Sequence, residues 1–216
     1  MRKGGIFLQI KNSLKYSLYV IFHPFNGFWE LKREKKGSPW SVFIILTTLI
    51  ILLCLKQQFT GFILNPNVGN SPFSLILQIE IVLIPFLLWC VSNWSITTLV
   101  DGEGTFKDIA ITTAYSLIPI ILFTIPLIIM SRFITFEESQ MYDLLFAISL
   151  IWSAFLLLTG IMTIHQFSLT KTLITILIAI VGMLVISFII LLFFALISQV
   201  YNWAYLIYRE ISLRNI

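Results

Sequence analysis

Long apolar stretches alternate with short polar segments along most of the chain. Five stretches have the length and uniform hydrophobicity of membrane-spanning helices, namely residues 39–55, 74–100, 108–131, 142–162 and 171–200. A helix needs about 20 predominantly apolar residues to cross the hydrocarbon core of a bilayer. The first stretch follows Ser38 and opens with Pro39, which favour a helix start as N-cap and first helical residue. The last stretch is the longest, so we expect it to tilt, to bend near Gly182 or to project beyond the bilayer.

The N-terminal segment has a different pattern. Apolar residues recur at helical spacing between Ile6 and Phe22, and the lysines fall toward the other side of that helix. This pattern predicts an amphipathic helix lying in the membrane interface, which Pro24 is expected to end. A signal peptide is not expected, because Lys11 and Lys15 interrupt the apolar stretch and no small-residue cleavage site follows it.

These patterns define the expected fold class: an all-α integral membrane protein, built as a five-transmembrane-helix bundle with an N-terminal interfacial amphipathic helix. We divide the chain into a basic cytoplasmic and interfacial segment (1–36), a five-helix transmembrane domain (37–200) and an interfacial C-terminal tail (201–216). Composition agrees, since 58% of the 216 residues are hydrophobic, 11% are charged and the mean hydropathy is +0.97. Soluble domains are about 25% charged, so a soluble enzyme, a disordered tail and a disulfide-stapled secreted module are excluded.

The distribution of the basic residues predicts the orientation. Eight of the 14 lysines and arginines lie within residues 1–36. With a cytoplasmic N-terminus, Lys107 and Lys171 raise the inner count to ten, against four on the outer side. The positive-inside rule therefore predicts an inner N-terminus and an outer C-terminus, in a membrane that we expect to be the bacterial cytoplasmic membrane. We expect membrane lipids rather than nucleic acid to face the basic N-terminal run, because phenylalanines and tryptophans interleave with its charges.

The polar loop of residues 101–108 joins the second and third apolar stretches on the expected inner side. Thr105 and Asp108 have the spacing of a helix capping box. Gly102 and Gly104 permit backbone conformations that other residues avoid, including a left-handed helix C-cap. Asp101 is disfavoured at a helix C-terminus by the macrodipole, so we expect it to have a cationic partner or to belong to a ligand site.

Two further polar segments, residues 23–34 and 165–171, are expected on the same side, and each contains one of the two histidines. These histidines and the nearby carboxylates could bind zinc or iron, or each histidine could hydrogen-bond a loop carbonyl. We assign no metal site and no cofactor. Our candidate partner- or ligand-binding residues on the inner side are Asp101, Gly102, Glu103, Gly104, Lys107, Asp108, His165, Gln166, His23, Trp29 and Arg33. We expect the three polar segments to converge into one site, because carboxylates next to apolar spans need nearby cations.

Polar residues inside the spans form the second group of candidates. Asn93, Trp94 and Thr97 lie near the inner end of the second span. They favour either close helix packing with interhelical hydrogen bonds or a polar cavity open to the cytoplasm. Glu80 is the one acidic residue well within a span, and its place near the outer end makes it a weak candidate for proton transfer.

Three segments carry a resemblance to the Yip family of membrane proteins, named for its interaction with Ypt/Rab GTPases, and the similarity is greatest to the bacterial branch. They are residues 23–36 (HPFNGFWELKREKK), 93–119 (NWSITTLVDGEGTFKDIAITTAYSLIP) and 165–172 (HQFSLTKT). The resemblance implies a five-helix bundle with a cytoplasmic N-terminus. Eukaryotic members act as adaptors in vesicle trafficking without known catalysis. The chain shows no Asp-Leu-Tyr-Gly-Pro type motif, which argues against a GTPase partner.

Together these features predict a non-enzymatic membrane scaffold or accessory subunit. Its cytoplasmic loops would dock another membrane protein, such as a transporter complex, or a second copy of the chain. The alternative is a small permease or a lipid- or ion-handling transporter with a polar cavity facing the cytoplasm. No catalytic residues are assigned, because the sequence contains no nucleophile–base pair, P-loop, dinucleotide fingerprint or zinc-protease motif.

Overall fold

The structure, a computed structural model, describes residues 16–61, 64 and 73–214, and over these residues it is helical without strands. The helices are α2 (Pro24–Arg33), α3 (Pro39–Phe59), α4 (Leu75–Leu99), α5 (Phe106–Ser116), α6 (Ile118–Met130), α7 (Ser139–His165) and α8 (Leu169–Arg214). Five candidate membrane spans result, with α5 and α6 together forming one of them. The prediction of an all-α protein is therefore confirmed, with five helical segments that are long and apolar enough to cross a membrane.

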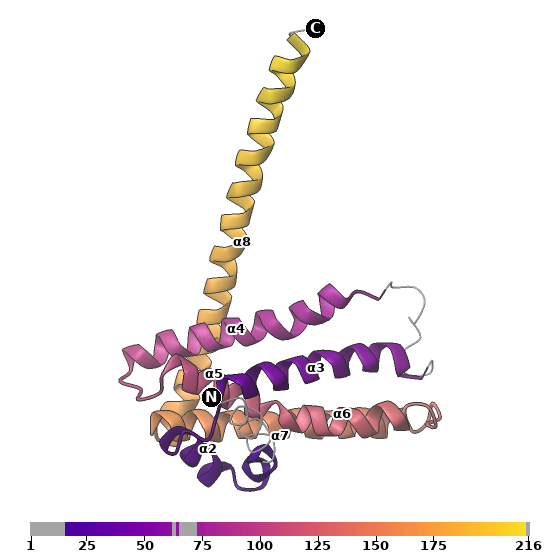
Figure 1. The fold of residues 1–216 in the computed structure, drawn as a ribbon, viewed down its shortest axis with the longest axis vertical. Coiled ribbons are helices and arrows are strands. Elements are labelled where there is room, and N and C mark those ends of the chain that lie inside the picture. Colours follow the sequence, from indigo (N-terminus) through magenta and orange to yellow (C-terminus); the bar gives the residue numbers. More distant parts are fainter. Residues whose placement is uncertain (1–15, 62–63, 65–72, 215–216) are drawn as a thin grey trace, which may run out of the picture.

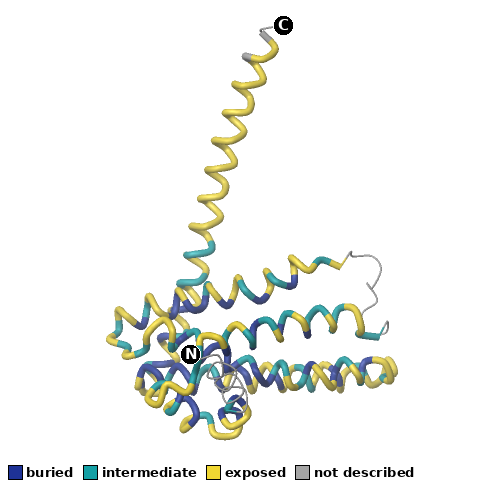
Figure 2. Tube along the Cα trace, in the orientation of Figure 1, coloured by how far each residue is buried: buried dark blue, intermediate teal, exposed yellow. Residues whose placement is uncertain are grey.

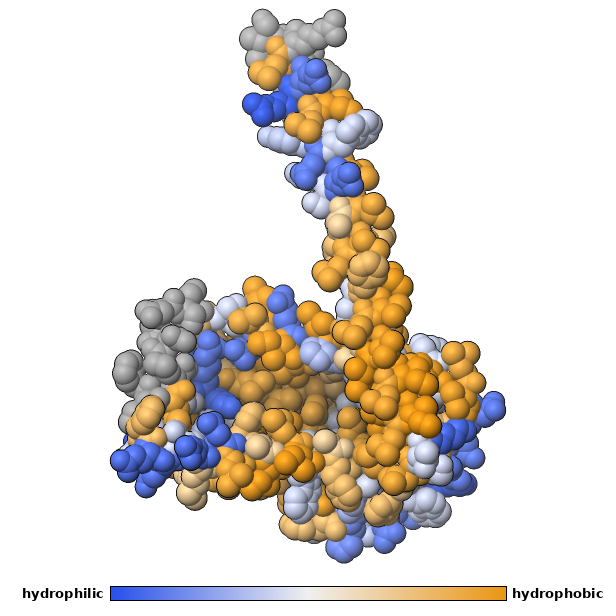
Figure 3. Space-filling model, turned by 180° about the vertical axis from the view of Figure 1, so that it is seen from behind, coloured by the Kyte–Doolittle hydropathy of each residue, from blue (hydrophilic) through white to orange (hydrophobic). Residues whose placement is uncertain are grey.

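The helices α4, α3, α6 and α7 lie side by side in that order (Figure 1). The shorter α5 packs against α3, α4 and α7 at one end of this row. Buried apolar side chains from every one of these helices form a continuous core around the fully buried Tyr115 and Leu156. The outward faces are apolar as well, as expected for a surface in contact with lipid (Figure 3).

The third span is broken in the middle, where a single helix over residues 108–131 was predicted. Its first part begins at Phe106, and Leu117 separates α5 from α6. Pro119 has no amide hydrogen, and a proline ring clashes with the carbonyl four residues earlier. The Leu117 amide bonds the carbonyl of Ala114, three residues back, so the last turn of α5 is tightened where it ends.

The last helix leaves the bundle at a steep angle and projects far beyond it (Figure 1). Contrary to the expected boundary near residue 200, α8 is continuous from Leu169 to Arg214. Gly182 lies inside this helix and serves close packing, because a Cβ there would collide with the Ser92 hydroxyl of α4. That hydroxyl donates a hydrogen bond of 2.6 Å to the carbonyl of Ala179 on α8. Beyond this contact with α4, α8 is exposed (Figure 2).

The N-terminal segment contains one more helix than the sequence pattern indicated. Residues 16–22 are helical, whereas the greater part of the predicted amphipathic helix lies outside the described residues. Pro24 is the first residue of α2, so it starts a second helix that carries the expected interfacial anchors and basic residues. The buried face of α2 includes Phe28 and Leu31, and α2 packs against α7. The segment of residues 24–33 is therefore attached to the bundle.

Candidate functional site

Three segments that are distant in sequence meet at one end of the helix row. They are Lys32 on α2, the α4–α5 loop of residues 100–105 and residues 164–171, which join α7 to α8; we call them the loop cluster. The opposite end, where α3 ends and α4 and α7 begin, is the far end of the bundle. All three polar motifs of the sequence contribute to the loop cluster, although not through all the residues that were expected.

Lys32 links all three segments. Its Nζ atom donates hydrogen bonds to Glu103 Oε2 at 2.8 Å and to the carbonyl of Ile164 at 2.7 Å. Carbonyls in the last turn of a helix lack an amide partner and carry partial negative charge, so Lys32 acts as a C-terminal cap of α7. The hydrogen bond from Lys32 also lowers the pKa of the Glu103 carboxyl. One ammonium group thus fixes α2 to both the loop and α7.

His165 forms the buried side of the loop cluster. Its side chain is 2% exposed, and its ring stacks against Phe167 with 5.3 Å between centroids. The Gly104 amide donates to His165 Nδ1 at 3.2 Å, which requires Nδ1 to be unprotonated. The neutral ring then carries its hydrogen on Nε2, an atom that is buried without a hydrogen-bond partner among the described residues.

The two loop glycines are required by close approach to this ring. A Cβ on Gly102 would lie 2.5 Å from His165 Nδ1 and 2.9 Å from the carbonyl oxygen of Thr97. A Cβ on Gly104 would lie 2.7 Å from His165 Cε1. Neither glycine uses the left-handed conformation that it permits; Asp101 and Gln166 have positive φ angles instead, both 55°.

Asp101 does not have the cationic partner that was expected for it. The residue is exposed, and within the described part of the chain no lysine or arginine nitrogen lies within 4.0 Å of its carboxylate. Water can solvate this carboxylate, and aspartate is one of the few residues that tolerate the left-handed conformation. The C-terminus of α4 is capped instead by Lys171, whose Nζ donates to the carbonyl of Val100 at 2.9 Å.

The capping box at the start of α5 is confirmed. The amide of Asp108 donates to Thr105 Oγ1 at 3.3 Å, and the amide of Thr105 donates to Asp108 Oδ2 at 3.1 Å. Asp108 therefore has a structural role at the helix start. Lys107, the next residue back in the chain, is exposed.

The candidates on α2 face away from the buried part of the loop cluster. Trp29 is 49% exposed, and Arg33 is also exposed. His23 stacks on Tyr19 with 4.9 Å between ring centroids. Lys36 pairs with Glu30 at 2.6 Å and with Glu34 at 2.8 Å. Among the described residues, no group of three or more His, Cys, Asp or Glu side chains could hold a metal ion.

The polar residues of the second span divide into buried and exposed groups. Asn93 is fully buried, and both polar atoms of its side-chain amide lack a partner among the described residues. Thr97, one turn further along α4, is also buried and donates to the Asn93 carbonyl at 2.8 Å. Trp94 lies on the outside of α4 with its ring edge-on to Phe106. Glu80 is exposed toward the far end.

Lys32 and Lys171 were absent from our candidate list, although they hold the loop cluster together. Each is near a helix C-terminus in space but distant from it in sequence, so a local cap pattern cannot reveal it. Lys171 also lies over the ring of Phe167 at 4.1 Å. The sequence signal that could have pointed to Lys32 and Lys171 is the excess of cations over carboxylates on the expected inner side of the spans.

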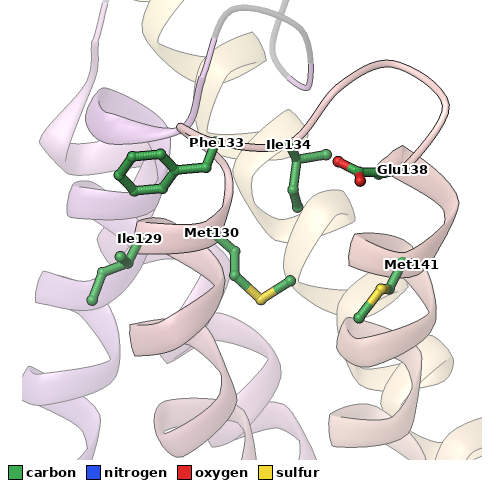
Figure 4. A pocket seen from close by; sticks show the side chains of 6 residues that line it. All are labelled: Ile129, Met130, Phe133, Ile134, Glu138 and Met141. Carbon is green, nitrogen blue, oxygen red and sulfur yellow. The ribbon is translucent and has the colours of Figure 1, made fainter.

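The far end carries a pocket of a different kind. A cavity of about 350 Å³ lies between the end of α6, the following loop and the start of α7 (Figure 4). Its lining is apolar except for Glu138, whose carboxylate accepts a hydrogen bond from the Thr135 amide at 3.1 Å. Because that carboxylate already caps the local backbone, the pocket offers little chemistry for a polar ligand.

Comparison with protein families gives one match. Residues 18–192 match the family model described as the Yip1 domain, which covers most of the spans and the whole loop cluster. Comparison with curated proteins and with solved structures gave no match. The family match agrees with the five apolar helices, which indicate an integral membrane protein. Because the matched region is far more than half of the chain, the protein belongs to the Yip1 domain family.

Proposed function

We propose that this Yip1 domain protein is a non-enzymatic scaffold or accessory subunit that docks another membrane protein through the surface around its loop cluster. The carrying observation is that Lys32 and Lys171 hold the loop in place with contacts from the chain itself, so a fixed polar surface exists without a ligand. A pre-organised surface loses little conformational entropy when a partner binds.

The exposed residues next to this fixed loop support the proposal. Trp29 and Arg33 project from α2, Asp101 from the α4–α5 loop and Lys107 from the first turn of α5, without a described ion pair. Tryptophan and arginine are the residue types that most often dominate protein interfaces. The distribution of basic residues supports a cytoplasmic position for this surface, with the N-terminus inside and the C-terminus outside.

The test is purification of the tagged full-length chain from its native membrane in mild detergent. Quantitative mass spectrometry would compare wild type with the double variant Trp29→Ala and Arg33→Glu. The matched control is Phe133→Ala with Arg132→Glu, which makes the same kinds of change at the far end. We expect a stoichiometric partner to be lost from the first variant and kept by the second. Equal recovery with all three proteins, or no partner with wild type, contradicts the proposal.

A small permease is the second candidate, supported by one observation. The side-chain amide of Asn93 is fully buried in α4 without a described partner, and such a group normally bonds to water or to a ligand. Most buried hydroxyls nearby bond to carbonyls of their own helix and need no ligand, as in Ser116 and Thr172. Reconstituted liposomes test this candidate: flux that exceeds empty vesicles and disappears in Asn93→Leu favours a permease over a scaffold.

A further inference from the structure

A polar cavity lies at the far end of the bundle, away from the loop cluster. It has a volume of about 470 Å³ and lies between the end of α3 and the starts of α4 and α7. Its polar and aromatic lining includes Lys56, Gln57, Gln78, Tyr142, Asp143 and Phe146. Two residues of opposite charge thus face one cavity at the edge of an otherwise apolar bundle.

Lys56 reaches this cavity without a paired carboxylate. Its Nζ atom lies 3.8 Å from the centroid of the Phe146 ring and 5.8 Å from that of Tyr142. No carboxylate oxygen of a described residue lies within 4.0 Å of it. Contact with aromatic rings offsets part of the cost of desolvating an ammonium group, but it does not replace an anion. The site therefore holds a half-buried positive charge that an anionic group can neutralise.

Asp143 supplies the opposite charge in the same cavity. It is exposed near the start of α7 and interacts with Lys56 through space but not by direct contact. Between α3 and α4 the wall is fixed by a hydrogen bond of 2.6 Å from Gln78 Nε2 to Gln57 Oε1. The two charges thus face one polar cavity without a direct ion pair, which leaves room for a ligand that carries both signs.

The position of the cavity along the helices determines which molecules can reach it. Lys56 lies in the last turn of α3, a helix of 21 residues. At 1.5 Å per residue such a helix is about 31 Å long, which matches the hydrocarbon core of a bilayer. The cavity therefore lies at the depth of lipid headgroups. The positive ends of the α4 and α7 dipoles also point toward this level, which favours a phosphate there.

We propose that this cavity binds the headgroup of a zwitterionic phospholipid, with its phosphate at Lys56 and its ammonium at Asp143. A simple anion would be attracted to Lys56 but repelled by Asp143. A simple cation would be attracted to Asp143 but repelled by Lys56. A zwitterion with separated charges satisfies both residues. The cavity and the loop cluster are at opposite ends of the bundle, so this inference is independent of the scaffold proposal.

The experiment uses the purified full-length chain, delipidated in detergent. It is titrated with short-chain phosphatidylethanolamine, short-chain phosphatidylglycerol or inorganic phosphate, and binding is followed by native mass spectrometry and by the shift in thermal unfolding. Wild type should bind phosphatidylethanolamine most tightly and inorganic phosphate least. Lys56→Gln should weaken binding of both lipids by about tenfold, as expected when a charge-assisted hydrogen bond is lost. Asp143→Asn should weaken only phosphatidylethanolamine, so that phosphatidylglycerol becomes the preferred lipid.

Lys35→Gln is the matched control, since it removes one exposed lysine charge between α2 and the start of α3, at the opposite end, and should leave all three affinities unchanged. Equal binding of the two lipids by wild type overturns the proposal. Tight binding of inorganic phosphate identifies a site for the free anion and overturns it as well. If Lys56→Gln does not fold, the exposed Asp143→Asn decides alone, because unchanged lipid preference in that variant excludes a role for the charge pair.

Discussion

At the scale of single residues, the loop cluster depends on a few contacts that leave no room for larger side chains. His165 fills the space that a Cβ on either Gly102 or Gly104 would need. The two glycines differ in one respect, since only Gly102 also lies against a backbone carbonyl, that of Thr97. A collision with a side chain can be relieved by removing that side chain, whereas a collision with the backbone cannot.

Gly104→Ala is therefore predicted to destabilise the protein by about 1–3 kcal/mol, the usual cost of overpacking. In the background of His165→Ala the same substitution should cost much less, because the added methyl group then has space. Gly102→Ala should remain costly in both backgrounds. Thermal or denaturant unfolding in detergent measures all four differences, and strictly additive effects for Gly104 and His165 would contradict the contact.

The ion pair between Glu103 and Lys32 predicts a pH dependence. The pKa of Glu103 is lowered in the folded protein by the hydrogen bond from Lys32, so the unfolded chain binds a proton at a higher pH than the folded chain. The contribution of this pair to stability is present above the ordinary glutamate pKa and is lost as the pH falls through the lowered value. In the Glu103→Gln variant, the midpoint of unfolding should depend less on pH in that acidic range. In the Glu137→Gln variant, the pH dependence of the midpoint should be the same as in wild type.

Asp101 gives a prediction that follows from its backbone and not from its charge. Its φ of 55° suits asparagine as well as aspartate, and its carboxylate has no described ion pair. Asp101→Asn should leave the free energy of unfolding nearly unchanged. Asp101→Val should cost about 1–2 kcal/mol, because a β-branched residue is strained in the left-handed region. Destabilisation by the asparagine variant would show that the negative charge itself is needed.

At the scale of elements, α2 is attached to the bundle by its buried apolar side chains, of which Phe28 is the largest, and by the ammonium group of Lys32. Phe28 is fully buried, and a Cβ on Gly160 of α7 would lie 3.2 Å from its ring. Lys32, one turn further along α2, adds the contacts to Glu103 and Ile164. The buried apolar contact contributes most of the free energy that holds α2 on the bundle, and the ammonium group fixes the position of α2 relative to the loop.

Phe28→Ala is predicted to detach α2 from the bundle, at a cost of about 3–5 kcal/mol to the packed state. The readout is crosslinking by a short bifunctional thiol reagent between cysteines placed at Lys32 and Glu103, which should be efficient in an otherwise wild-type chain and strongly reduced with Phe28→Ala. Phe25→Ala is the matched control, because Phe25 lies on the same helix and is 50% exposed. Equal crosslinking in both variants would mean that burial of Phe28 is not what holds α2 against the bundle.

At the scale of the whole molecule, α8 is the feature that departs most from a compact bundle. It has 46 residues, which at 1.5 Å each gives roughly 69 Å, about twice the thickness of a hydrocarbon core. Only 6% of an 18-residue apolar window of α8 is buried, and most of the helix is exposed (Figure 2). Its exposed hydrophobic residues include the consecutive positions 188–194 and therefore occupy all sides of the helix. A helix that is apolar all round and exposed to this degree needs lipid or another protein around it.

Cysteine labelling tests how α8 is surrounded in native membranes. In a chain whose two native cysteines are replaced, single cysteines at Leu184, Ile189 and Leu196 should not react with an impermeant thiol reagent, because lipid covers every face. A cysteine at Tyr208 should react, since the polar residues Asn202, Arg209 and Glu210 mark the end of the apolar part. Reaction at one of the three inner positions but not at the others would instead indicate a water-exposed face.

The sequence alone determined the elements that depend on local chemistry. Apolar length sets each span, because the bilayer requires about 20 apolar residues, and the Thr105–Asp108 spacing sets the start of α5. These features use neighbours within a few positions of the chain. The association of the three polar segments could also be anticipated. The order of the spans puts all three segments on the same side of the membrane, where their opposite charges can meet.

The tertiary structure decided which groups meet. Lys32 pairs with Glu103 and not with Asp101, and Gly102 is required by His165 across 63 positions of sequence and not by its own φ angle. Ser92 contacts α8 at Ala179 and Gly182 and so holds only the first turns of this helix. The rest of α8 continues in the direction that these turns set. Hydrophobic pattern gives the apolar faces of a helix but not the distances between side chains on different helices, and those distances determine ion pairs, caps and cavities.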